Sequence, residues 1–154
     1  MAHRRVGALT RRIISLGARD WRDLWRAQWA LIVAQRLVRQ RAPGQLTARN
    51  EDALPSRDAL SPSPGAEHAH VLGAAVRRAA TYGVFRPACL VRAIALRRLL
   101  VADGIRGAVI RVGVKQSEEG MLAHAWVELD GDVIGDTVAN VREYAPLNEL
   151  SVVP

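Results

Sequence analysis

The stretch CLVRAIALRRLLVADGIRGAVIRVGV, residues 89–114, changes from helical to strand patterning near its middle. Pro87 lies near the first turn of the expected helix and Gly104 lies just past its end, so a helix is predicted over 88–102. AVIRVGV (108–114) is rich in β-branched residues and predicts a strand. The chain therefore passes from helix to sheet within one short segment.

Two further strands follow this stretch. LAHAWVEL (122–129) and DVIGD (132–136) are separated by Asp130-Gly131, a dipeptide typical of a hairpin turn. Upstream, AEHAHVLGAAVRRAATYG (66–83) has helical spacing and ends on a glycine that is placed to cap a helix. Helices that precede a strand meander predict an α+β fold.

The front of the chain differs from this core in composition. From about Thr10 to Arg41 the pattern is that of one or two amphipathic helices. APGQLTARNEDALPSRDALSPSPG (42–65) is rich in Pro, Ser and Gly and has no apolar periodicity. We therefore expect a basic helical arm over 1–41, a linker or long loop over 42–65 and the core over 66–154.

The positive charge is concentrated at the front. The net charge is +7, and residues 1–57 carry 12 Arg against 4 acidic residues, a net +8, whereas the remainder is at −1. Such an arm is suited to binding nucleic acid, a membrane surface or an acidic peptide. Alternatively, its arginines form a solvated helix face. A single cysteine excludes an internal disulfide, zinc-ligand spacing is lacking, and no apolar stretch approaches the ~20 residues that span a bilayer. We expect a cytoplasmic protein without a metal.

The only cysteine, Cys89, lies in the first turn of the predicted helix. A helix start presents unpaired N–H groups and a partial positive charge, which favour a thiolate over a thiol. Its helix face also carries Ala93, Leu96 and Leu100, so the cysteine is expected to point into the fold. The position suits a nucleophile, although a lone cysteine is more often a small buried apolar residue.

A histidine and an aspartate on the two strands after it are candidate partners. A two-residue loop at Asp130-Gly131 would set His124 opposite Thr137 and leave Asp136 on the other face. A three-residue loop that starts at Leu129 and closes with a G1 bulge would set His124 directly opposite Asp136. We expect the second register, because it lets the imidazole and the carboxylate meet as general base and orienting acid for the cysteine nucleophile.

These segments resemble a known family. Residues 89–114, followed by HAWVELDGDVIGD (124–136), look like the leader peptidase of lasso-peptide biosynthesis, a transglutaminase-like, papain-like cysteine protease. The resemblance is close over 86–145 and looser over the Trp-rich front. It implies a catalytic triad of Cys89, His124 and Asp136, without a cofactor, on a helix packed against an antiparallel sheet.

The resemblance also implies a substrate and partners. Members of the family remove the leader from a ribosomally made precursor peptide before a separate ATP-dependent cyclase closes the macrolactam ring. Some carry a fused winged-helix leader-binding module, but residues 1–65 show no strand pattern. We therefore expect a stand-alone peptidase that works with a separate leader-binding protein (a RiPP recognition element), and neither nucleic acid nor a membrane as partner. TYGVFRPAC (81–89) contains no Gln or Asn, so the oxyanion hole is assigned to the backbone N–H of Cys89 and a second, unidentified donor.

Tryptophans supply the remaining candidate residues. Trp126 shares a strand face with His124, where it is either core or a wall of the substrate cleft. A stripe at i+4 spacing in the arm is expected to pack on the core or, with adjacent arginines, to bind the partner or an acidic leader. The stripe and its arginines are Trp21, Trp25, Trp29, Arg22 and Arg26.

Two other functions use the same features. An acyl or glutaminyl transferase would use the same three residues, and its product would be an amine adduct in place of a hydrolysed leader. A non-enzymatic nucleic-acid-binding protein would use the basic arm, although the chain has no recognisable RNA or DNA motif. Rapid alkylation of Cys89 by iodoacetamide near neutral pH would favour an enzyme over such a protein.

Overall fold

Helices precede the sheet along the chain, which confirms the predicted α+β class. The computed structural model describes residues 17–40 and 65–147, so most of the predicted linker and the first part of the predicted arm lie outside the described residues. The elements are α2 (Ala18–Gln40), α3 (Ala66–Tyr82), α4 (Cys89–Ala102), β1 (Val109–Ser117), β2 (Gly120–Leu129), β3 (Asp132–Ile134), α5 (Val138–Val141) and β4 (Ala145–Leu147).

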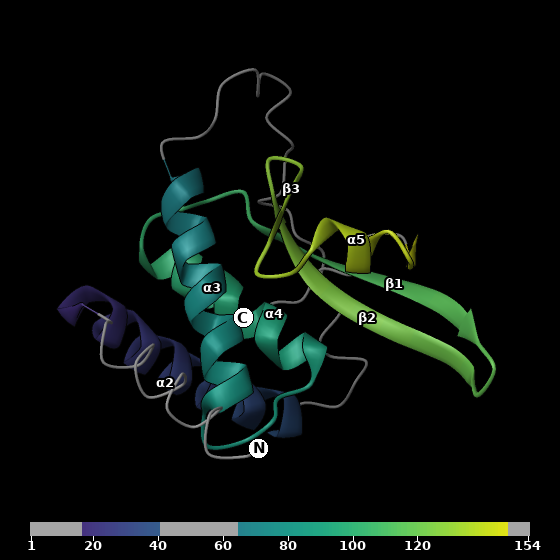
Figure 1. Cartoon of the computed structure of the whole chain (residues 1–154), viewed down its shortest axis with the longest axis horizontal. Helices are drawn as coiled ribbons and strands as arrows, with labels where there is room; N and C mark the ends of the chain where they lie inside the picture. The colour runs from purple at the N-terminus through teal and green to yellow at the C-terminus, as the bar shows by residue number, and fades with distance from the viewer. Residues whose placement is uncertain (1–16, 41–64, 148–154) are drawn as a thin grey trace, which may run out of the picture.

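The four strands form one antiparallel sheet in the order β3-β2-β1-β4. Strands β1 and β2 make a long hairpin in which Gly113 lies opposite His124. Figure 1 shows the three long helices α2, α3 and α4 gathered together beside the sheet, with the far end of this hairpin extending away from them. Helix α5 and strand β4 were not predicted from the sequence.

A single hydrophobic cluster joins the three long helices to the sheet. Helix α2 contributes Ala27, Leu31 and Ala34, none of which is exposed to solvent. The helix expected in the basic arm therefore packs into the same core as α3 and α4. Among the described residues, no helix is long and apolar enough to cross a membrane.

The tryptophan stripe lies on the opposite side of α2 from this core. Trp25 and Trp29 are 71% and 65% exposed, and Trp21 is 40% exposed. The interpretation that the stripe packs on the core is therefore wrong. Alanines fill the helix interfaces because their small side chains let α2 approach α3 and α4 closely, which leaves the bulky indoles on the outer face.

An ionic cluster ties the three long helices together. Arg26 of α2 binds both carboxylate oxygens of Asp103, the residue that follows α4, and His68 Nε2 of α3 lies 2.7 Å from Asp103 Oδ2. The hydrogen bond from Arg26 holds the pKa of Asp103 below its ordinary value, with a smaller contribution from His68. The Arg26 guanidinium thus contributes to the fold, whereas the Arg22 side chain is 66% exposed.

The turn between β2 and β3 has two residues, so the predicted three-residue loop is wrong. Leu129 pairs with Asp132, and Asp130 and Gly131 have φ values of 51° and 90°. Two successive positive φ values belong to a type I′ turn, whose twist matches that of the strands, and Asp-Gly accommodates it well. If the strand pairing continued in this register, His124 would lie opposite Thr137 and not opposite Asp136.

Candidate active site

Cys89 is the first residue of α4, as the sequence predicted. Ala88 precedes it in an extended conformation with ψ 160°, and its carbonyl accepts the first helical hydrogen bond, from the Arg92 N–H at 3.1 Å. No side chain caps this helix start. The first-turn N–H groups are therefore directed toward the cysteine end of the helix, where an anion is stabilised.

His124 and Asp136 are bound to each other, although not through strand pairing. His124 Nε2 lies 2.7 Å from Asp136 Oδ2, and the two side chains are 9% and 20% exposed. An ionised carboxylate only accepts hydrogen bonds, so Nε2 carries the proton and donates it. In the neutral ring Nδ1 is then the nitrogen that can accept a proton from a thiol.

A glycine turn brings Asp136 to the histidine. Strand β3 ends at Ile134, and Gly135 has φ 78°, a left-handed conformation that leaves the ladder. A Cβ on Gly135 would lie 2.8 Å from Leu96 Cδ2, and one on Gly73 of α3 would lie 2.7 Å from the Gly135 nitrogen. Close packing against α3 and α4 therefore fixes the bend that directs Asp136 toward His124.

Asn140 and Thr137 complete the binding of the carboxylate. The Thr137 backbone N–H donates to Asp136 Oδ1 at 2.7 Å, and Asn140 Nδ2 donates to Oδ1 at 3.1 Å and to Oδ2 at 3.2 Å. Burial alone would raise the pKa of Asp136, but the hydrogen bonds from His124, Thr137 and Asn140 outweigh it and leave this pKa below its ordinary value. Asp136 is therefore an anion able to orient the imidazole.

Aromatic rings enclose the imidazole of His124. The Trp126 ring stacks beside it at a centroid distance of 6.1 Å. The centroid of the Tyr144 ring lies 5.0 Å from that of the imidazole, and the two ring planes are inclined by 33°. Trp126 is 4% exposed, and its indole N–H donates to Glu128 Oε1 at 2.8 Å. Trp126 thus supports the histidine, and substrate contact by this residue stays a prediction.

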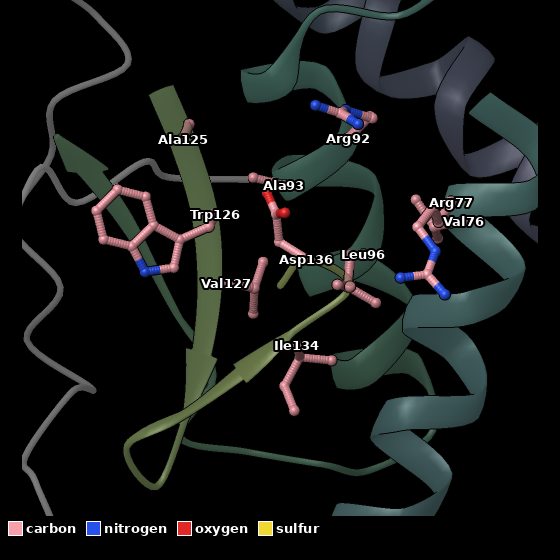
Figure 2. A pocket seen from close by; sticks show the side chains of 11 residues that line it. Val76, Arg77, Arg92, Ala93, Leu96, Ala125, Trp126, Val127, Ile134 and Asp136 are labelled. Atoms are coloured by element: carbon pink, nitrogen blue, oxygen red, sulfur yellow. The ribbon is translucent and has the colours of Figure 1, made fainter. Parts of the chain in front are cut away.

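Cys89 lies on the helix that faces this pair. A crevice between α3, α4 and the sheet is lined by Ala93 and Leu96 of α4 and by Asp136, and Figure 2 shows the Asp136 carboxylate beside Ala93. Ala93 is four residues after Cys89 and so lies one turn farther along the same face of α4. Among the described residues no hydrogen bond joins the Cys89 sulfur to His124, so their convergence stays a prediction.

Sequence reasoning missed Asn140 and Tyr144. Both lie in the segment after β3, where Thr137 caps the one-turn helix α5 by accepting from the Asn140 N–H at 3.3 Å. A Thr followed three residues later by Asn is a weak helix-start signal that could have revealed the turn. In the described part of the chain, no group of three or more His, Cys, Asp or Glu side chains could hold a metal ion.

Comparison with known proteins supports the same fold. A family model described as the transglutaminase-like superfamily matches residues 24–149, which include the helices, the sheet and all three predicted triad residues. No curated protein and no solved structure gave a significant match. The match begins within α2, so it includes Trp25 and Trp29 but not Trp21.

Proposed function

The chain belongs to the transglutaminase-like superfamily, whose members are in general cysteine-dependent enzymes, and from this membership we propose that it is a cysteine peptidase with Cys89, His124 and Asp136 as its triad. The observation that carries the proposal is the His124–Asp136 hydrogen bond of 2.7 Å at Nε2. It leaves Nδ1 as the proton acceptor for a thiol, and the only cysteine of the chain begins the helix that packs on the same strand.

The proposed reaction has two halves. Nδ1 of His124 takes the thiol proton, and the Cys89 thiolate attacks the scissile carbonyl to give a tetrahedral oxyanion near the start of α4. Collapse of this intermediate breaks the C–N bond as the imidazolium gives its proton to the leaving amine. Water, deprotonated by His124, then attacks the thioester, and a second collapse releases the carboxylic acid and restores the thiol.

Asp136 orients the ring throughout this cycle. Its hydrogen bond keeps the proton on Nε2 and stabilises the imidazolium that forms in each half-reaction. The lowered pKa of Asp136 keeps this group ionised over the neutral range, so its role does not change with pH there. Loss of this orientation weakens catalysis without removing the nucleophile.

We propose the leader of a ribosomally made lasso-peptide precursor as the substrate. The resemblance of residues 86–145 to lasso leader peptidases supports this choice. A stand-alone peptidase of this kind depends on a separate leader-binding protein that delivers the precursor, and it acts before an ATP-dependent cyclase that uses the released amine. The amine is the new N-terminus of the core peptide.

The outer face of α2 is proposed to bind the leader-binding protein. Trp25 and Trp29 are largely exposed beside Arg22, and aromatic side chains with arginine dominate protein interfaces. The positive front of the chain favours an acidic partner surface. Arg26 is not part of this surface, because its guanidinium binds Asp103.

Cleavage of a precursor tests the proposal directly. The purified chain is mixed with the precursor peptide and leader-binding protein encoded beside it, and products are identified by mass spectrometry. Cys89→Ala and His124→Ala should abolish cleavage, Asp136→Ala should slow it, and exposed Arg98→Gln should cleave like the wild type. Continued trimming by Cys89→Ala would refute the triad, and an amine adduct in place of free acid would identify a transferase.

A separate assay tests the α2 surface. Trp25→Ser with Trp29→Ser should weaken binding of the leader-binding protein, measured by titration calorimetry, while cleavage of saturating precursor is retained. Thr81→Ser on exposed α3 serves as a surface control. Unchanged affinity of the double variant would exclude this face as the docking surface.

A further inference from the structure

Two arginines without an acidic partner flank the crevice beside Asp136. Arg92 comes from α4 and Arg77 from α3, and Figure 2 shows them on two sides of a space otherwise lined mainly by Val, Ala, Leu and Ile side chains. Within the described residues no hydrogen bond or ion pair of the Arg92 or Arg77 guanidinium is found, and the Nε of Arg92 is buried without a partner. A buried donor of a charged group that lacks an acceptor is costly, so the Arg92 Nε requires a compensating partner, either a water molecule or a ligand.

Two other arginines, Arg97 of α4 and Arg26 of α2, already have partners. Arg97 Nε donates to the Ala108 carbonyl at 3.1 Å, and Arg26 binds Asp103. Asp136 does not neutralise the pair, because its carboxylate is bound by His124, Thr137 and Asn140. The crevice therefore combines two arginine side chains and apolar walls with an Asp136 carboxylate whose oxygens are already hydrogen-bonded.

The crevice lies next to the proposed nucleophile. Arg92 is three residues after Cys89, so along the axis of α4 it is about 4.5 Å from it. One residue of an extended peptide spans about 3.3–3.6 Å. A substrate side chain that reaches Arg92 therefore belongs to a residue within about two positions of the peptide bond that Cys89 attacks.

The enclosed part of this crevice is small. Its volume is about 20 Å³, whereas roughly 10–15 Å³ on this measure holds one water. A carboxylate head fits such a space better than an aromatic ring does. A planar carboxylate is also the partner that a guanidinium binds most strongly in a partly dry site.

We propose that Arg77 and Arg92 form a specificity subsite that binds an acidic side chain of the peptide substrate within two residues of the scissile bond. The inference rests on the proposed peptidase function and names a feature of its substrate. Binding of the carboxylate supplies the acceptor that Arg92 Nε lacks. It also sets the peptide backbone along α4, with the scissile carbonyl near Cys89.

The first test uses two alkylating reagents that differ only in charge. Iodoacetate carries a carboxylate and iodoacetamide is its neutral counterpart, and both react with the Cys89 thiolate. The ratio of their rates should fall about three- to tenfold in Arg92→Gln and in Arg77→Gln, since an attractive charge within a few ångströms is removed. Arg92→Lys should retain most of the ratio, because it retains the charge.

The matched control is Arg98→Gln on the exposed face of α4. It removes one positive charge, as the other variants do, so a general effect of net charge would lower its ratio equally. An unchanged ratio in Arg98→Gln with a lowered ratio in Arg92→Gln localises the effect to the crevice. Equal ratios in all variants, or no reaction of Cys89 with either reagent, would overturn the subsite.

The second test uses matched peptide substrates. The starting peptide is one that the wild type cleaves. At each of the four positions within two residues of the scissile bond, a variant with Glu is compared with a variant with Gln. One position should show a Glu preference in kcat/KM that Arg92→Gln removes, and amidation of the peptide C-terminus should leave it unchanged. Equal cleavage of the Glu and Gln peptides at every position would refute the subsite but not the proposed peptidase function. Absence of any cleavage, with an Arg92-dependent alkylation ratio, would refute the peptidase alone.

Discussion

Replacement of Gly135 by alanine tests how the fold places the candidate acid. Gly135 precedes Asp136 and has φ 78°, and Gly104 after α4 has φ 79°. The two glycines therefore impose nearly the same backbone strain on an alanine. They differ in surroundings, because a Cβ on Gly104 meets nothing within 4 Å, whereas one on Gly135 meets Leu96 Cδ2 at 2.8 Å.

The magnitudes follow from this difference. A left-handed alanine costs about 1–2 kcal/mol, and this is partly offset by about 0.4–1 kcal/mol from the reduced freedom of the unfolded chain. Gly104→Ala should therefore lose about 0–1.6 kcal/mol. Leu96 is only 3% exposed and cannot move into solvent, so Gly135→Ala adds an overpacking cost of about 1–3 kcal/mol.

The assays separate stability from placement of the acid. Urea unfolding gives the free energy of unfolding of both variants, and cleavage gives kcat/KM. A displacement of Asp136 by about 1 Å lowers the rate up to about 100-fold, whereas Gly104→Ala should cleave like the wild type. Equal stability and equal kcat/KM of the two variants would refute the conclusion that packing on Leu96 sets the position of Asp136.

Three further predictions concern the hydrogen bonds around two aspartates. Asn140→Ala removes two hydrogen bonds to Asp136, so the pKa of Asp136 should rise toward 3.8 and kcat/KM should fall about tenfold, as measured by NMR titration and by cleavage; an unmoved titration would exclude this role of Asn140. Arg26→Met should lower the free energy of unfolding by about 1–3 kcal/mol because it leaves Asp103 with one partner, while exposed Arg19→Met should change it little. Both aspartates have pKa values below the ordinary 3.8, so their stabilisation is complete above that pH and is lost as the pH falls through the lowered values. Acid unfolding followed by circular dichroism should therefore begin below about pH 4, with a shallower decline in Arg26→Met, and a decline that is complete above that pH would contradict the assignment.

Local patterns were sufficient to predict the main elements. The helix that begins at Cys89, the glycine that follows it and the strand that carries His124 all depend on short-range periodicity and turn chemistry. Helix α5 and strand β4 were missed because each is only a few residues long and is stabilised by contacts with residues far along the chain. Short elements carry too little periodicity to be recognised.

The pairing of His124 with Asp136 was predicted from a register that the fold does not adopt. The turn at Asp130 and Gly131 has two residues, and the side chains meet because Gly135 leaves the strand and bends back. The glycine of DVIGD permits a bend, but nothing local fixes its direction. It exists because Leu96 and Gly73, which are distant in sequence, leave room there for a glycine and for nothing larger.

The amino-acid sequence by itself determined the long helices and the β1–β2 hairpin, the place of one cysteine at a helix start, and a histidine on β2 with an aspartate shortly after β3. The tertiary structure alone decided which face of α2 is buried, how the aspartate reaches the imidazole, and which arginines lack an acidic partner. The physical reason is range: backbone preference acts over a few residues, whereas close packing and the pairing of charges depend on side chains that only the folded chain brings into contact.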